Sequence, residues 1–160
     1  MSPNGLLPSG SVTAWMFALN LAATWYMVGL IWMVQIVHYK MFDRVGEAGF
    51  ARYAADHARL ITPIVLLPMS VELLSAVGLV WAAPPGSPRV VLGIGLALVG
   101  VVWLSTALLQ VPCHNLLSRG FQPDVYGRLV QTNWIRTIAW TTRGALMLWL
   151  LLQQLLPAGR

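Results

Sequence analysis

The three histidines of the chain, His38, His57 and His114, each lie where an apolar stretch meets a polar one. Neutral imidazole is the commonest protein ligand for transition metals, and it also exchanges protons near neutral pH. Three imidazoles that met at one place could bind iron, copper or zinc, and two on opposed helices could ligate a haem. Metal-free acid–base catalysis and plain hydrogen bonding to loop carbonyls or lipid headgroups are the alternatives. We therefore treat all three as candidate catalytic residues and metal ligands, with the cofactor itself unidentified.

A second chemically capable group lies in the last apolar stretch, where Asn133 and Arg136 are one helical turn apart. A guanidinium group with a neighbouring amide can bind a carboxylate, a phosphate or a phenolate, and flanking indoles can stack on a flat ring. Arg136 is thus also a candidate catalytic residue. Two glutamines lie within a turn of the same level on other spans. The predicted substrate-binding set is Gln35, Gln110, Asn133, Trp134, Arg136 and Trp140.

Two charged residues lie deep within predicted membrane spans. At about 1.5 Å per residue, Glu72 and Arg143 are both roughly 18–21 Å from the same edge. An unpaired charge at that depth costs about 2.5–3.5 kcal/mol even on the mild insertion scale. We therefore expect a Glu72–Arg143 ion pair, which could be an interhelical lock, part of a proton relay or a counter-charge for a ligand.

The elements that must position these residues follow from composition. The chain has 160 residues, of which 58% are hydrophobic and only 9% charged. Its mean hydropathy is +0.69, which is outside the range of soluble domains and indicates an integral membrane protein. A helix needs about 20 apolar residues to cross a bilayer. We predict one all-α domain, an antiparallel four-helix bundle with spans at about 14–37, 60–81, 90–111 and 129–156, the first of which is not a removable signal peptide.

Helical phasing gives each span one polar stripe. Because residues three, four or seven apart share a helix face, the polar side chains of each span align. Hydrocarbon does not solvate polar groups, so the four stripes should face one another. Antiparallel connections then bring the histidines, Asn133 and Arg136 to one rim of the bundle. Residues 39–59, with alternating charged and apolar side chains, predict an amphipathic surface segment beside that rim.

Positive charge is concentrated beside two of the three predicted connections. By the positive-inside rule, these connections are cytoplasmic, both termini are extracytoplasmic, and the protein is multi-pass in the cell inner membrane. The net charge of +5 is then a topology signal and does not indicate nucleic-acid binding. The basic residues on the cytoplasmic side are Lys40, Arg44, Arg52, Arg59, Arg119 and Arg128, against Arg89 and Arg160 on the other.

The last span also carries a short motif, N-W-I-R-T at residues 133–137, followed by Trp140 and Arg143. This pattern resembles the last helix of the small four-helix membrane proteins grouped around the anthrone oxygenases, and it covers about the last quarter of the chain. The resemblance implies a cofactor-light oxygenase that acts on polycyclic phenolic compounds. It also implies that Asn133, Trp134 and Arg136 help form a substrate pocket.

Two functions from different classes fit these features. The first is a small redox or oxygenase-like enzyme with a site at the cytoplasmic end of the bundle and a hydrophobic substrate. The second is a non-enzymatic membrane subunit, or a haem- or quinone-binding module, whose polar seam is structural. The expected partners are the lipid bilayer, a hydrophobic small molecule, and further copies of the chain or a membrane complex. Iron, copper and haem are the candidate cofactors.

Overall fold

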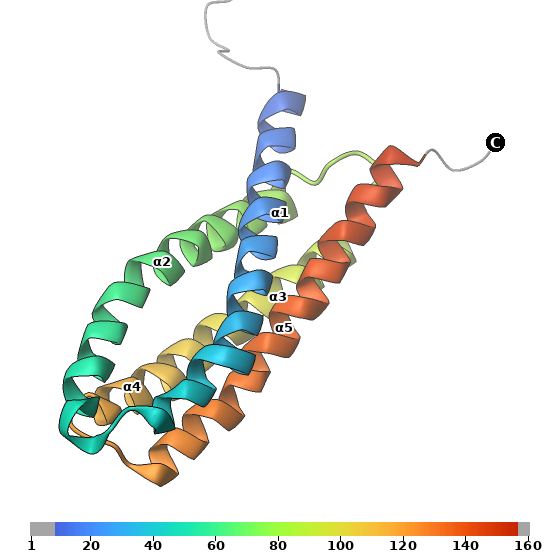
Figure 1. Ribbon diagram of the computed structural model, residues 1–160. Coiled ribbons are helices and arrows are strands. Elements are labelled where there is room, and N and C mark those ends of the chain that lie inside the picture. Colours follow the sequence, from blue (N-terminus) through green and yellow to red (C-terminus); the bar gives the residue numbers. More distant parts are fainter. Residues whose placement is uncertain (1–8, 157–160) are drawn as a thin grey trace, which may run out of the picture.

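The computed structural model describes residues 9–156, and every element in that range is helical (Figure 1). Four long rods lie against one another and alternate in direction. The start of the first rod, the second connection and the end of the last rod lie at one end of the bundle. The first and third connections lie at the other, here called the loop end. The elements are α1 Ser9–Met33, a π-helical turn Val34–His38, a 3-10 turn Tyr39–Arg44, α2 Glu47–Trp81, α3 Arg89–Ser105, a π-helical turn Thr106–Gln110, α4 Val111–Leu117 and α5 Pro123–Leu155.

Three of the rods are long and apolar enough to cross a membrane: Gly10–Arg44, Glu47–Trp81 and Arg89–Leu117. The predicted fourth span, 129–156, corresponds to α5, which is not among them within the described residues. The buried face of α5 explains the difference, because it carries two arginines and other polar side chains. The polar face of α5 thus lies inside the bundle.

The segment at 39–59 is amphipathic, as predicted, but its apolar side packs against the bundle, and all of it except Val45 and Gly46 is helical. The first rod continues as far as Arg44, and α2 already begins at Glu47. The apolar residues of the segment face the core, with Phe42 and Phe50 both 0% exposed. They pack with Leu117 and Leu129 in a cluster that closes the loop end of the bundle.

Helix irregularities surround the middle of the bundle. Pro63 and Pro68 lie inside α2, which curves along its length (Figure 1). Pro112 has no N–H, and its ring would clash with the carbonyl four residues earlier in a regular helix. The π-helical turn Thr106–Gln110 lies directly before this proline and lets the rod continue through it. Single π turns are frequent at functional sites.

Candidate functional site

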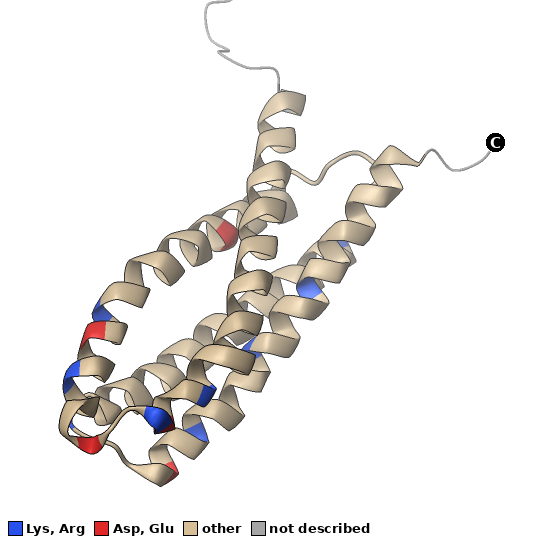
Figure 2. Ribbon diagram, in the orientation of Figure 1, with Lys and Arg blue, Asp and Glu red and all other residues tan. Residues whose placement is uncertain are grey.

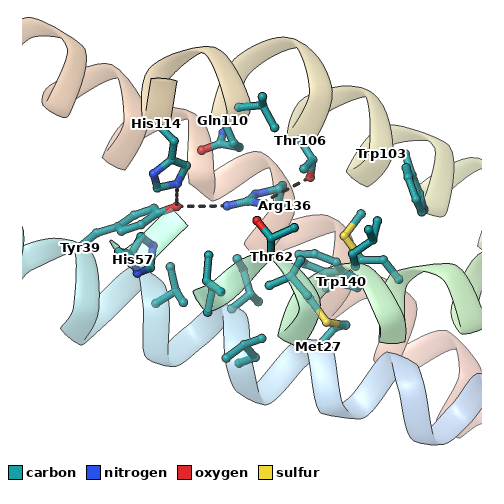
Figure 3. A pocket seen from close by; sticks show the side chains of 18 residues that line it. Met27, Tyr39, His57, Thr62, Trp103, Thr106, Gln110, His114, Arg136 and Trp140 are labelled. Carbon is teal, nitrogen blue, oxygen red and sulfur yellow. Dashed lines mark hydrogen bonds between the residues drawn. The ribbon is translucent and has the colours of Figure 1, made fainter. Parts of the chain in front are cut away.

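A cavity of about 190 Å³ lies between the rods, towards the loop end (Figure 3). Most of its wall is apolar, from residues such as Met27, Ile31, Val65, Met69 and Trp140. Polar side chains line the end nearest the loops: Tyr39, His57, Gln110, His114 and Arg136. The π-helical turn Thr106–Gln110 contributes Thr106 and Gln110 to the wall, and the turn Val34–His38 contributes Val34.

The hydroxyl of Tyr39 is the centre of the polar end. Arg136 Nη2 donates to it over 3.4 Å, and His114 Nε2 lies 3.0 Å from it (Figure 3). Because arginine only donates, the Tyr39 hydroxyl is free to donate its own proton to His114 Nε2. A neutral His114 then carries its proton on Nδ1, a buried atom without a partner in the described chain. Tyr39 and His114 therefore form a hydrogen-bonded pair beside the guanidinium group of Arg136.

The three histidines form one cluster, as their positions at the span edges predict. His38 Nε2 lies 2.9 Å from His57 Nδ1, and the ring centroids of His57 and His114 are 5.4 Å apart. His38 Nε2 and His57 Nδ1 are hydrogen-bonded to each other, so these two atoms are not free to ligate a metal. Among residues 9–156, no group of three His, Cys, Asp or Glu side chains is arranged to hold a metal ion. The predicted metal-ligand role thus gains no support from this geometry.

Arg136 is 6% exposed and is held by neutral groups. Its Nε donates to Asn133 Oδ1 over 2.9 Å, its Nη2 donates to the same oxygen, and its Nη1 lies 3.4 Å from Thr106 Oγ1. Asn133 Nδ2 in turn donates to Gln35 Oε1 over 2.7 Å. Neither Asn133 nor Gln35 lines the cavity. Both belong to the predicted substrate-binding set, and in the structure they form a hydrogen-bonded chain that ends at Arg136.

Arg143, two turns further along α5, has a carboxylate partner. Its Nε lies 2.8 Å from Glu72 Oε1, with both side chains at most 2% exposed, so the two residues expected to pair from their depth do form an ion pair. Arg143 also donates to Asn20 Oδ1 and to the Gly95 carbonyl. Trp140 Nε1 donates to the second oxygen of Glu72 over 2.9 Å. This network is closed, and it forms the floor beneath the cavity through Trp140.

Gln110 and Trp134, two further residues of the predicted substrate-binding set, lie in different parts of the bundle. Gln110 lines the cavity and donates to Thr132 Oγ1 over 3.0 Å, which leaves its buried Oε1 without a partner in the described chain. Trp134 is 39% exposed and packs edge-on against Trp32 at 5.7 Å between ring centroids. It lies on the outer surface of the bundle and does not line the cavity.

Tyr39 lines the cavity although the sequence patterns do not predict it as a site residue, because it begins the predicted surface segment at 39–59. The signal was present, because Tyr39 lies four residues after Gln35 and therefore on the same helix face. This spacing carries no weight if the first rod ends near residue 37, as the sequence predicts. In the structure the rod continues to Arg44, and Tyr39 is 2% exposed.

No protein-family model, no curated protein and no solved structure matches the chain. What the site can do therefore follows from its own chemistry. A mostly apolar cavity with a few convergent polar groups is the usual form of a small-molecule site. Here the polar groups are the buried guanidinium of Arg136, the hydrogen-bonded pair Tyr39–His114, and the amide of Gln110, whose Oε1 has no partner among residues 9–156.

Proposed function

We propose that the chain is a multi-pass protein of the cell inner membrane, with the loop end of the bundle in the cytoplasm and both termini outside. Three apolar rods support the insertion. So do large outward-facing apolar side chains such as Leu67, Leu74 and Trp81, which are 69%, 72% and 83% exposed. Figure 2 shows most Lys and Arg residues at the loop end, the distribution that the positive-inside rule associates with the cytoplasm.

Within that protein, we propose a small redox or oxygenase-like enzyme that acts on a hydrophobic substrate. The observation that carries this proposal is the apolar cavity that ends at the Tyr39–His114 pair and Arg136. A dry cavity of about 150 Å³ accepts benzene, so 190 Å³ suits one substituted ring. A polycyclic phenolic compound, the class implied by the N-W-I-R-T resemblance, would extend through the cavity mouth.

The mouth opens sideways, which suits a substrate dissolved in lipid. Three residues line the cavity and are exposed on the outside of the bundle: Thr62 and Leu66 on α2, and Val111 on α4. All three belong to the apolar rods. A hydrophobic substrate could therefore pass between α2 and α4 from the inner leaflet.

The polar end supplies acid–base chemistry. A hydroxyl on the substrate, bound beside Tyr39, would pass its proton to the Tyr39 hydroxyl, which would pass its own proton to His114 Nε2. Arg136 would stabilise the oxygen anion that remains, because its charge is buried and close by. An electron-rich anion is the species that dioxygen can oxidise. His57 and His38 would then carry the proton towards the loop end.

The test is dioxygen uptake by the purified protein in lipid nanodiscs, with a panel of hydrophobic phenols. Tyr39→Phe and His114→Gln should each lower the rate by about 10²–10⁴-fold, the usual contribution of general acid–base catalysis. Trp134→Phe, which changes an indole on the outer surface, is the matched control and should keep the rate. Absence of uptake with every phenol, or equal rates in all variants, would refute the enzyme.

The second candidate is the non-enzymatic subunit or quinone-binding module, and the closed network around Glu72 favours it. That network satisfies its buried groups without a ligand, as a structural seam requires. Binding of iron, copper or haem by the histidines would require the hydrogen bond between His38 and His57 to break. An absorption spectrum and elemental analysis of the purified protein separate these forms from the metal-free enzyme.

A further inference from the structure

We infer that the cavity binds its ligand as a small lipophilic monoanion, with one carboxylate or phenolate group on Arg136 and an apolar body between α1, α2 and α5. The inference rests on the proposed function and specifies its substrate class. It is carried by the partners of Arg136 and by the size and composition of the cavity wall.

Arg136 lacks a counter-charge within the described chain. The ion pairs formed by residues 9–156 are Arg52–Asp56, Arg59–Asp56 and Glu72–Arg143. Arg136 belongs to none of them, although it is 6% exposed. A buried cation is stable when it is paired and fully hydrogen-bonded. An anionic ligand would complete this arrangement.

Only some of the N–H donors of the Arg136 guanidinium group make close hydrogen bonds. Of its five N–H groups, the two directed at Asn133 make close hydrogen bonds. Those directed at Thr106 and Tyr39 span 3.4 Å, which is long for a hydrogen bond. The fifth has no partner among residues 9–156. A carboxylate or phenolate oxygen beside the cavity could accept from these weakly used donors at normal length.

The rest of the wall limits the ligand to one negative charge. Arg136 is the only Lys or Arg among the residues that line the cavity, so a phosphate dianion would lack a second cation. The apolar wall and the volume of about 190 Å³ suit a ring or a branched chain of similar bulk.

The experiment is calorimetric titration of the full chain in nanodiscs of phosphatidylcholine, a lipid without net charge. The probes are benzoate, 4-nitrophenolate, the neutral isostere benzamide, and phenyl phosphate. Benzoate or 4-nitrophenolate should bind at least roughly tenfold more tightly than benzamide, because hydrogen bonds to charged groups are the strong ones. Whichever of the two binds more tightly identifies the acid as a carboxylate or a phenolate. Phenyl phosphate should bind more weakly than either.

Arg136→Gln should remove the preference for the anion, and Arg136→Lys should keep part of it. Arg128→Gln is the matched control, since it removes a charge from an exposed position on the same helix and should leave the preference intact. The wild-type comparison decides the matter even if Arg136→Gln does not fold. Equal binding of benzoate and benzamide would overturn the inference and leave a neutral hydrophobic substrate for the proposed enzyme. Absence of binding by every probe would overturn both.

Discussion

Arg136 and Arg143 lie two turns apart on α5 and are both buried, yet they are bound in opposite ways. Arg143 has a carboxylate, an amide oxygen and a backbone carbonyl as acceptors, from Glu72, Asn20 and Gly95. Arg136 has neutral partners, two of them at 3.4 Å. The arginine side chain at position 143 thus completes a polar network. The one at position 136 has weakly used donors beside a cavity. Pairing, more than burial, therefore separates a structural charge from a candidate binding charge.

The largest effect is expected from Glu72→Gln, which leaves Arg143 buried without its counter-charge. Removing one member of a buried pair costs about 3–5 kcal/mol of unfolding free energy, to be measured by denaturant unfolding in detergent micelles. Asp56→Asn, at an exposed carboxylate with surface ion pairs, is the control and should cost about 0–1 kcal/mol. Wild-type stability of Glu72→Gln would show that Arg143 does not depend on the pair.

A smaller loss is expected from Asn133→Ala, which removes the acceptor of two Arg136 donors and the donor to Gln35. Buried groups left without partners cost about 1–3 kcal/mol. Because Arg136 would lose its fixed orientation, affinity for benzoate should fall as well. The measurements are unfolding and titration of the same preparation. Loss of stability with unchanged affinity would mean that Asn133 does not position Arg136 for binding.

Gly95→Ala tests how tightly the closed network is packed. A Cβ at this position would lie 2.8 Å from Arg143 Nη1, whereas one at Gly100 meets nothing within 4 Å. Crowding a well-packed interior costs about 1–3 kcal/mol, so Gly95→Ala should lower the thermal unfolding temperature. Gly100→Ala is the matched control on the same helix and should not lower it. Equal unfolding temperatures would mean that Arg143 can shift without cost.

The smallest effect is expected from Arg136→Gln in the absence of ligand. Replacing a buried charge that lacks a counter-charge removes an existing cost, so the free energy of unfolding should stay within about 1 kcal/mol of wild type or rise. The measurement is unfolding under the conditions used for Glu72→Gln. A loss as large as that of Glu72→Gln would place Arg136 among the structural charges and end the contrast between the two arginines.

The sequence predicts correctly those features that depend on the length and composition of a whole span. Composition and the length of the apolar stretches predict the helical rods. The equal depth of Glu72 and Arg143 in their spans predicts their ion pair, because a polar group is costly in hydrocarbon. Phasing also placed His38, His57 and His114 near one another. It could not tell that His38 and His57 bond each other, since ring orientation depends on packing with residues such as Phe42, 5.1 Å from His38 between centroids.

Other parts of the site depend on where a rod ends and which way it turns. Tyr39 was missed because nothing local marks the continuation of the first rod to Arg44. Trp134 was placed in the pocket because its neighbours Asn133 and Arg136 point inward, but adjacent helical residues differ by about 100°. The side on which an indole lies is decided by its contacts, here with Trp32, and these are not visible in the sequence.

The two π-helical turns have a consequence for how homologues of this chain should be aligned. Each turn, Val34–His38 and Thr106–Gln110, contains one residue more than a regular helical turn would. A relative that lacks this extra residue would keep its rods but rotate everything beyond the turn by about 100°, which would move the counterparts of Tyr39 and His114 off the cavity wall. One-residue gaps at these two places would therefore separate homologues that share the pocket from those that share only the bundle.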